Sequence, residues 1–255
     1  MHAWLGEQMD TRRPDFEYDA LVDRLMENFG PARRIWPVNR RLTAWLILQL
    51  AILGLVAGAA PRMDLPGQLR NPQYLLQLAA FVVTGAIAAW LALRTAIPSR
   101  EAKRAELVII GIAAVIAIFS VRSGPAGVTV PWGQFIRAGS RCLICTTLLA
   151  APPWFVLFWA VRRGAPFAVK TAGGLIGAAA FCFAFTASRL GCAIDSPSHL
   201  LVWHVLPIVA GTVVSLRAGR RLAATQEQRP ARAFLIAARS AIANQRTRGS
   251  NAPRQ

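Results

Sequence analysis

Residues 73–93 read QYLLQLAAFVVTGAIAAWLAL, a stretch of 21 residues without Asp, Glu, Lys or Arg. An α-helix rises about 1.5 Å per residue, so about 20 apolar residues cross the roughly 30 Å hydrocarbon core of a bilayer. Five more uncharged apolar runs occupy residues 42–60, 107–121, 142–161, 171–188 and 200–216. Uncharged neighbours can lengthen the two shortest runs. The sequence therefore predicts six membrane-spanning segments.

The composition excludes a soluble single-domain enzyme. The 255 residues are 55% hydrophobic and 16% charged, which exceeds the apolar fraction that a soluble domain of this size can bury. A soluble protein with six buried helices would have too little polar surface to cover them. Within a bilayer each backbone N–H and C=O needs a partner in its own segment, and helices provide it. The expected fold class is an all-α polytopic membrane protein with six transmembrane helices and a short N-terminal amphipathic helix.

The basic residues predict the orientation of the chain. A net charge of +17 would suggest nucleic-acid binding in a soluble protein, but here the charges flank the apolar runs. If the runs alternate in direction, 23 of the 29 Lys and Arg residues lie on the side that holds both termini. The positive-inside rule makes that side the cytoplasm of a bacterial inner membrane. We expect a cytoplasmic N-terminal segment (1–41), a transmembrane domain (42–216) and a basic cytoplasmic tail (217–255).

The N-terminal segment contains a predicted docking helix. Residues 15–29, DFEYDALVDRLMENF, have the spacing of an amphipathic helix that begins after Pro14 and ends before Gly30. Residues 1–30 hold seven of the 12 acidic residues and lack the apolar core of a signal peptide. Such a helix suits a basic partner with an apolar groove, although it can also fold onto the protein's own arginine-rich loops or stay solvated. The residues expected to contact a partner are Phe16, Tyr18, Leu21, Val22, Leu25, Met26 and Phe29, with the acids Asp15, Asp19 and Asp23.

The tail carries a second amphipathic pattern, PARAFLIAARSAIANQR at residues 230–246. Arginines opposite apolar residues are typical of a helix on a membrane surface, so membrane lipids are expected contacts. A disordered polar tail is the alternative for this segment, and residues 249–255 are expected to be disordered.

The four cysteines separate by their depth in the predicted membrane. Cys142 opens the fourth run and Cys192 follows the fifth, so both lie at the outer face. An oxidising periplasm can join them there or leave two thiols for a soft metal. Cys145 and Cys182 lie deeper, and both are expected to be small buried hydrophobic residues. The CxxC spacing of Cys142 and Cys145 permits a redox pair but is not specific within an apolar segment.

Two histidines follow Cys192 by seven and twelve residues, His199 and His204. Each ring can offer a nitrogen to a metal, pair with a thiolate, or simply hydrogen-bond to a neighbour. The candidate metal ligands are Cys142, Cys192 and His199, without a particular metal being indicated. No cofactor is expected.

Motifs of common enzymes and transporters are absent from the sequence. It has no phosphate-binding glycine loop after a strand, no GxSxG elbow, no HExxH and no zinc-finger spacing. The predicted spans contain no carboxylate, and His204 is essentially their one group for ion or proton relay, which argues against transport. These observations favour a function other than catalysis.

Two other classes remain open from the residues alone. A membrane thiol-disulfide oxidoreductase would use Cys142 and Cys145 as its active pair, with Cys192 as a shuttle. Such an enzyme needs two cysteine pairs near the periplasm that exchange disulfides with each other. Cys182 lies in mid-span and cannot easily reach a periplasmic substrate. A structural protein without a signal is also compatible, because small residues pack well in any bundle; examples here are Gly173, Gly174 and Gly177.

Four stretches resemble one protein family. They are RRIWPVNRR (33–41), NPQYLLQLA (71–79), CLICTTLLAAPPWFVLFWAVRRGAP (142–166) and GCAIDSPSHLLVWHVLP (191–207). Together they are similar to the NrsF family of bacterial membrane anti-sigma factors, over roughly residues 14–222. The most specific pieces are the Cys before a Pro-Pro span that ends in Arg-Arg-Gly-Ala-Pro, and the Cys-x-x-Asp-Ser segment that leads into Trp-His.

The resemblance implies a signalling role. Members of this family have six spans, keep an extracytoplasmic-function sigma factor inactive at the inner membrane, and carry two periplasm-facing cysteines implicated in sensing. By motif those cysteines are Cys142 and Cys192. The expected partner is such a sigma factor, held by the N-terminal helix and released under redox or metal stress. Direct nucleic-acid binding is not expected, and the sequence leaves the oligomeric state open.

Overall fold

The computed structural model describes residues 23, 36–97, 102–122, 131–164 and 169–220. The chain divides into two compact units, Met1–Ile35 and Trp36–Gln255. In the first unit only Asp23 is described, and it is helical and exposed. The rest of the predicted docking helix and the predicted tail helix lie outside the described residues.

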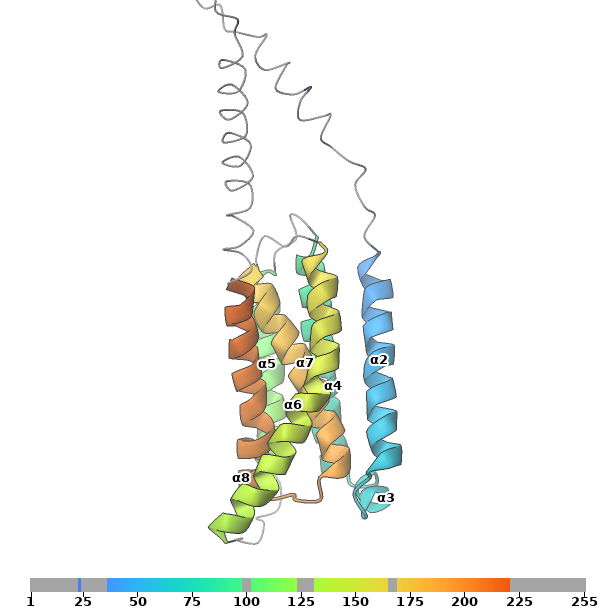
Figure 1. Ribbon diagram of the computed structural model, residues 1–255, viewed down its shortest axis with the longest axis vertical. Helices are drawn as coiled ribbons and strands as arrows, with labels where there is room; N and C mark the ends of the chain where they lie inside the picture. Colours follow the sequence, from blue (N-terminus) through green and yellow to red (C-terminus); the bar gives the residue numbers. More distant parts are fainter. Residues whose placement is uncertain (1–22, 24–35, 98–101, 123–130, 165–168, 221–255) are drawn as a thin grey trace, which may run out of the picture. The chain divides into compact units, whose positions relative to one another are not determined.

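The described part of the second unit is entirely helical (Figure 1). Its elements are α2 (Val38–Ala59), α3 (Leu65–Gln68), α4 (Pro72–Thr95), α5 (Arg104–Arg122), α6 (Trp132–Arg162), α7 (Val169–Gly191), α8 (Pro197–Leu200) and the π-helical turn η1 (Leu201–Val205). The helix continues from η1 to residue 220, and we refer to residues 197–220 as the last helix.

Six helices of the described region are long and apolar enough to cross a membrane: α2, α4, α5, α6, α7 and the last helix. The chain is therefore a multi-pass membrane protein, and the predicted all-α class with six spans is confirmed. The helices extend beyond the uncharged runs. α6 begins at Trp132, ten residues before Cys142, because Arg137 and Arg141 are tolerated in its first turns. Arginine side chains near a helix end can reach the polar interface of a bilayer.

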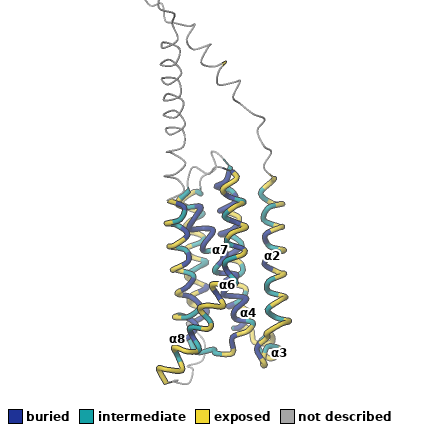
Figure 2. Tube along the Cα trace, in the orientation of Figure 1, coloured by how far each residue is buried: buried dark blue, intermediate teal, exposed yellow. Residues whose placement is uncertain are grey.

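Helix α7 is the centre of the bundle. Of its most apolar window, 83% is buried, against 11% for α2, and Figure 2 shows the buried residues concentrated along α7. It packs against α4, α6 and α2. Trp45 of α2 meets Phe183 of α7 edge to face, with ring centroids 5.2 Å apart, and donates a hydrogen bond of 2.9 Å to the Pro153 carbonyl of α6. These contacts join three helices in the middle of the membrane-spanning part.

Small residues let the last helix approach α7 closely. A Cβ built on Gly173 would lie 2.5 Å from the carbonyl oxygen of Ser215, and one on Gly177 would lie 2.8 Å from the Cα of Thr212. No side chain larger than hydrogen fits at either position without a backbone shift. Since lipid tails are as apolar as the helices, close van der Waals packing of this kind is what holds a membrane bundle together.

We therefore expect Gly173→Ala to destabilise the bundle by about 1 to 3 kcal/mol, the usual cost of overpacking. The matched control is Gly54→Ala on α2, where a Cβ meets nothing within 4 Å. The midpoint of thermal unfolding in detergent checks this. It should fall for the first variant and stay within error for the second. Equal midpoints for the two variants would contradict the packing described here.

Candidate functional site

Four side chains with metal-binding or nucleophilic atoms meet at the end of the bundle that also carries α3 and α8 (Figure 1). They are Cys142 on α6, Cys192 just after α7, His199 on α8 and His204 on η1. The two Sγ atoms are 3.7 Å apart, and Sγ of Cys192 is 3.6 Å from Nε2 of His199. The four atoms that these residues offer all lie within 4.8 Å of one another. We call this group the Cys-His cluster.

The cluster is largely closed to solvent. Cys192 is 8% exposed, His199 1% and His204 0%, whereas Cys142 is half-buried. Solvent or a solute therefore reaches the cluster most easily through Cys142. A buried thiol beside a ring nitrogen has chemistry that a surface thiol lacks, because its partners are fixed in place.

The end of α7 positions Cys192. The helix stops at Gly191, but the Cys192 N–H still donates to the Ser188 carbonyl at 2.9 Å, so the thiol stays on the last turn. A hydrogen bond from the Cys142 thiol stabilises the Cys192 thiolate, and one from the His199 ring acts in the same direction. The pKa of Cys192 consequently lies below its ordinary value, although burial opposes the shift.

Residues on α6 and η1 bring the two helices into contact beside the cluster. A Cβ on Gly139 would fall 1.9 Å from the Trp203 ring, so only glycine allows the indole to pack there. Cys142 lies one turn further along α6 and so faces the same neighbour.

The π-helical turn brings the two histidines together. In a regular α-helix, residues five apart point about 140° apart. In η1 the N–H of Leu206 donates to the carbonyl of Leu201, five residues back, so this turn is wider than an α-helical turn and holds more residues. His199 and His204 therefore come closer to the same side of the helix, with ring centroids 5.4 Å apart and ring planes tilted by 57°. Pro207 follows directly and, lacking an N–H, cannot make the α-helical bond that would tighten this turn.

An ion-pair network flanks Cys192 in the sequence. Asp195 accepts from Arg62 at 2.6 and 3.0 Å and from Arg189 at 2.7 Å. Arg62 also pairs with Asp64 at 2.6 Å. Both guanidinium groups are almost wholly buried, with side chains 1% and 2% exposed. Tyr74 of α4 lies under both arginines and donates to the Arg189 carbonyl at 3.0 Å.

The two arginines and two aspartates of the network have no net charge, and the arginines lower the pKa values of both aspartates. Burial alone would raise the pKa of Asp195, but hydrogen bonds from Arg62 and Arg189 outweigh it and the pKa lies below its usual range. The hydrogen bond from Arg62 likewise lowers the pKa of Asp64. Both carboxylates are therefore charged at neutral pH. They tie the segment after α2 to the segment after α7, which carries Cys192.

The burial of the four cysteines in the structure differs at one position from the burial expected from the sequence. The structure brings Cys142 and Cys192 into contact, a closer relation than the common depth that the sequence predicts. Cys182 is buried, as expected, but Cys145 is exposed, so the expectation of a buried Cys145 is wrong. The reason is the register of α6, in which Cys142 faces α7 and η1 while Cys145 faces outward. Cys142 thus has Cys192 as its partner, and the geometry does not favour a reactive CLIC pair.

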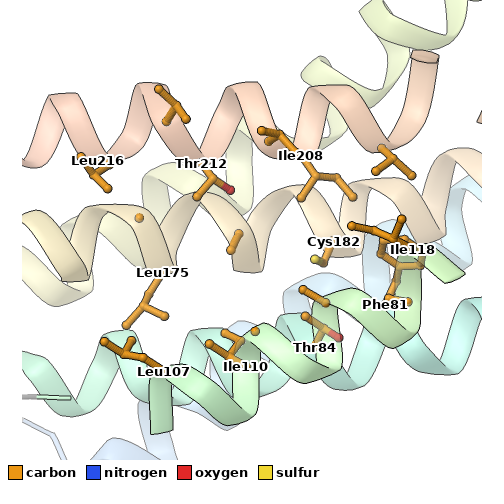
Figure 3. Close-up of a pocket in the computed structure, with 18 of the residues that line it drawn as sticks. Phe81, Thr84, Leu107, Ile110, Ile118, Leu175, Cys182, Ile208, Thr212 and Leu216 are labelled. Atoms are coloured by element: carbon orange, nitrogen blue, oxygen red, sulfur yellow. The ribbon is translucent and has the colours of Figure 1, made fainter. Parts of the chain in front are cut away.

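An apolar hollow lies apart from the cluster, between α4, α5, α7 and the last helix (Figure 3). Its volume is about 500 Å³, and residues such as Phe81, Leu175 and Ile208 line it. Cys182 and Thr84 contribute two of its few polar atoms, and the Thr84 hydroxyl already donates to the Ala80 carbonyl. This hollow offers no cluster of groups for chemistry, so the Cys-His cluster is the candidate site.

The profile of the NrsF family, described as "Negative regulator of sigma F", matches residues 25–224. The chain belongs to the NrsF family. The match includes all six spans and the whole Cys-His cluster. A search of curated proteins gives no match. A search of solved structures gives none either. As a member of the NrsF family the chain is a negative regulator of a sigma factor, and a sigma factor is its partner.

The ion-pair network makes a direct prediction about stability. Asp195→Asn removes the negative charge that two buried guanidinium groups share and replaces one of its two acceptor oxygens with an NH2 donor. We expect a loss of about 2 kcal/mol, somewhat less than for a wholly buried pair because this carboxylate is about one-third exposed.

The matched control is Asp64→Asn, the same change on a carboxylate that is about half exposed and contacts only one of the two arginines. Thermal unfolding in detergent should show a clearly larger fall for Asp195→Asn than for Asp64→Asn. A larger fall for Asp64→Asn would contradict the central position of Asp195.

Proposed function

We propose that this NrsF-family protein holds an extracytoplasmic-function sigma factor inactive at the bacterial inner membrane, and releases it when Cys142 and Cys192 sense redox or metal stress. The observation that carries the proposal is the contact between the two thiols, 3.7 Å apart at one end of a membrane bundle. They lie 50 residues apart in the sequence, one on α6 and one just after α7, so a reaction of the pair acts on the packing of those two helices.

The charge distribution supports the orientation that the proposal needs. With alternating spans, the termini and the α4–α5 and α6–α7 connections share one side, which has 23 of the 29 basic residues. The positive-inside rule favours the cytoplasm for that side. The Cys-His cluster is at the opposite end of the spans and so faces the periplasm, where oxidants and metal ions arrive.

The N-terminal segment supplies the means of holding a sigma factor. Its acids and its apolar residues suit a basic protein surface with an apolar groove, and sigma factors bind both DNA and RNA polymerase. Occupying such a surface with residues 15–29 keeps the sigma factor away from its targets. Tethering at the membrane adds a second barrier, since the partner is removed from the nucleoid.

The central helix supports a route from the cluster to the cytoplasmic side. Cys142 is on α6 and Cys192 follows α7, and α7 contacts α2, which leads directly to the N-terminal segment. A disulfide forms when the two thiols lose two protons and two electrons to a periplasmic oxidant, and it draws α6 toward the end of α7. Moving a two-state equilibrium from 1:99 to 99:1 needs about 5.5 kcal/mol of differential stabilisation. One disulfide typically contributes about 2 to 4 kcal/mol, so it shifts such an equilibrium over part of that range.

The docking helix can be tested with full-length protein. Leu21→Asp and Leu25→Asp place a charge on the apolar face of the predicted helix, so co-purification of the sigma factor in detergent should fall by at least about 10-fold. Ala20→Asp adds the same charge on the opposite face and should retain the partner. Equal retention by all three variants would overturn the docking role of this helix.

The sensing role predicts an altered response in cysteine variants. Cys142→Ser and Cys192→Ser should each abolish stress-induced transcription of a reporter under the control of the sigma factor, because the pair can no longer react. Cys145→Ser and Cys182→Ser are the matched controls and should respond normally. A normal response from the Cys142→Ser Cys192→Ser double variant would show that the input lies elsewhere.

A further inference from the structure

We infer that Cys142, Cys192, His199 and His204 form a four-coordinate site for a thiophilic divalent cation of the Zn²⁺ type. The inference rests on the proposed function in one respect: if the cysteine pair is a sensor, the metal ion is the stimulus that the pair detects. The binding itself follows from the geometry of the Cys-His cluster. It adds two histidine ligands, one on α8 and one on η1, to the two sensing cysteines.

The spacings match a tetrahedral centre. With Zn–S of about 2.3 Å and Zn–N of about 2.0 to 2.1 Å, tetrahedral angles place two sulfur ligands about 3.8 Å apart and a sulfur and a nitrogen about 3.6 Å apart. The two thiols are 3.7 Å apart, and Sγ of Cys192 is 3.6 Å from Nε2 of His199. All four candidate ligand atoms lie within 4.8 Å of one another. Small side-chain movements complete the coordination, without a change of backbone.

The hydrogen bonding of His204 leaves a nitrogen lone pair in the cluster. The single hydroxyl proton of Ser188 goes to the Phe185 carbonyl at 3.0 Å, so Ser188 Oγ accepts from Nδ1–H of His204 at 2.9 Å. Nε2 of His204 is then the unprotonated nitrogen. It is completely buried and makes no hydrogen bond of ordinary length and angle among the described residues, and the His204 ring interacts with the nearby Cys192 thiol. A buried acceptor without a donor is costly, whereas a metal satisfies it.

Ser188 thus has the position of an outer-shell residue. Histidines that bind metals nearly always donate their other ring N–H to a fixed acceptor, which sets the tautomer and the ring orientation. Here that acceptor is on α7, directly below the turn that carries Cys192. A histidine that serves only in packing would be expected to have both ring nitrogens paired. Here Ser188 fixes Nδ1 of His204, whereas Nε2 is free to bind a metal.

The charges also favour a divalent cation. Two thiolates and two neutral imidazoles around a dication give a neutral complex, which a closed site at the edge of a membrane can hold. The adjacent arginines do not oppose this, since Arg62 and Arg189 are paired with Asp64 and Asp195. Sulfur and imidazole ligands select Zn²⁺ and similar soft ions over Mg²⁺ and Ca²⁺, which prefer oxygen.

Cobalt titration of the full-length protein tests the site. The untagged protein, reduced and freed of metal in lipid nanodiscs, is titrated with Co²⁺ without oxygen and then with Zn²⁺. We expect one Co²⁺ per chain, thiolate-to-cobalt charge-transfer absorption, the visible bands of tetrahedral Co²⁺, and displacement by Zn²⁺. X-ray absorption of the Zn²⁺ form should then show two sulfur and two nitrogen neighbours. Octahedral cobalt spectra or oxygen-dominated coordination would overturn the inference.

Variants identify the ligands. His199→Gln, His204→Gln and Cys192→Ser should each weaken binding by at least about 100-fold, since even outer-shell changes cost 10- to 100-fold; Ser188→Ala should cost about 10-fold. Cys145→Ser and Cys182→Ser keep the four ligands and should bind normally. Helix content by circular dichroism identifies any variant that fails to fold, and Ser188→Ala tests His204 without removing its ring. Unchanged affinity in folded His199→Gln or in Ser188→Ala would overturn the assignment.

Failure of the site and failure of the proposed function are distinguishable in the same preparation. If Zn²⁺ binds through these four ligands but a bound sigma factor stays bound, the site is supported and the proposed metal input is wrong. If oxidation releases the sigma factor while Zn²⁺ and Co²⁺ do not bind at the cluster, the metal site is overturned and the cysteine switch is supported.

Discussion

The close packing of α7 against its neighbours is the interaction on which the rest of this structure depends. Within a bilayer the hydrophobic effect does not drive helices together, so the bundle needs surfaces that approach one another closely. Gly173 and Gly177 supply such a surface toward the last helix, and the Trp45 contacts supply another toward α2 and α6. Because α7 contacts α2, α4 and α6, a displacement of its end changes the packing of several helices.

The polar end of the bundle depends on that packing. Arg189 is on the last turn of α7, and its ion pair with Asp195 turns the chain back toward α8. Cys192 lies between these two residues and is held against Cys142 and His199. A buried, neutral ion-pair network of this kind contributes little net stability, but it fixes geometry. The Cys142 and Cys192 thiols thus lie beside a buried ion-pair network that joins the segment after α2 to the segment after α7.

The sequence predicted the membrane class and the approximate spans, because uncharged apolar runs of about 20 residues are typical of transmembrane helices. It also predicted that Cys142 and Cys192 share a face of the membrane, since Cys142 begins the fourth run, Cys192 follows the fifth, and successive runs alternate in direction. The outward direction of Cys145 was missed because it depends on how α6 is rotated in the bundle. The true start of α6 at Trp132 was missed because arginines near a helix end were treated as the limit of the span.

Other features of the site depend on contacts between distant parts of the chain. The pairing of Arg62 with Asp195 joins residues 133 positions apart, and no local pattern indicates it. His204 joins the cluster only through the π-helical turn; Pro207 was the one sequence signal for an irregular helix there. The unmatched nitrogen of His204 arises from a hydrogen bond to α7 that spacing alone does not reveal.

The central claim is the proposal that the state of the Cys142–Cys192 pair controls binding of a sigma factor by the N-terminal segment. It is tested most directly by bridging the two thiols with a short bifunctional thiol reagent in full-length protein in nanodiscs, with Cys145 and Cys182 replaced by serine. The affinity for the sigma factor is then measured before and after bridging. The account predicts a loss of at least about 10-fold, the scale of a typical coupling between distant sites. An unchanged affinity in fully bridged protein would contradict it.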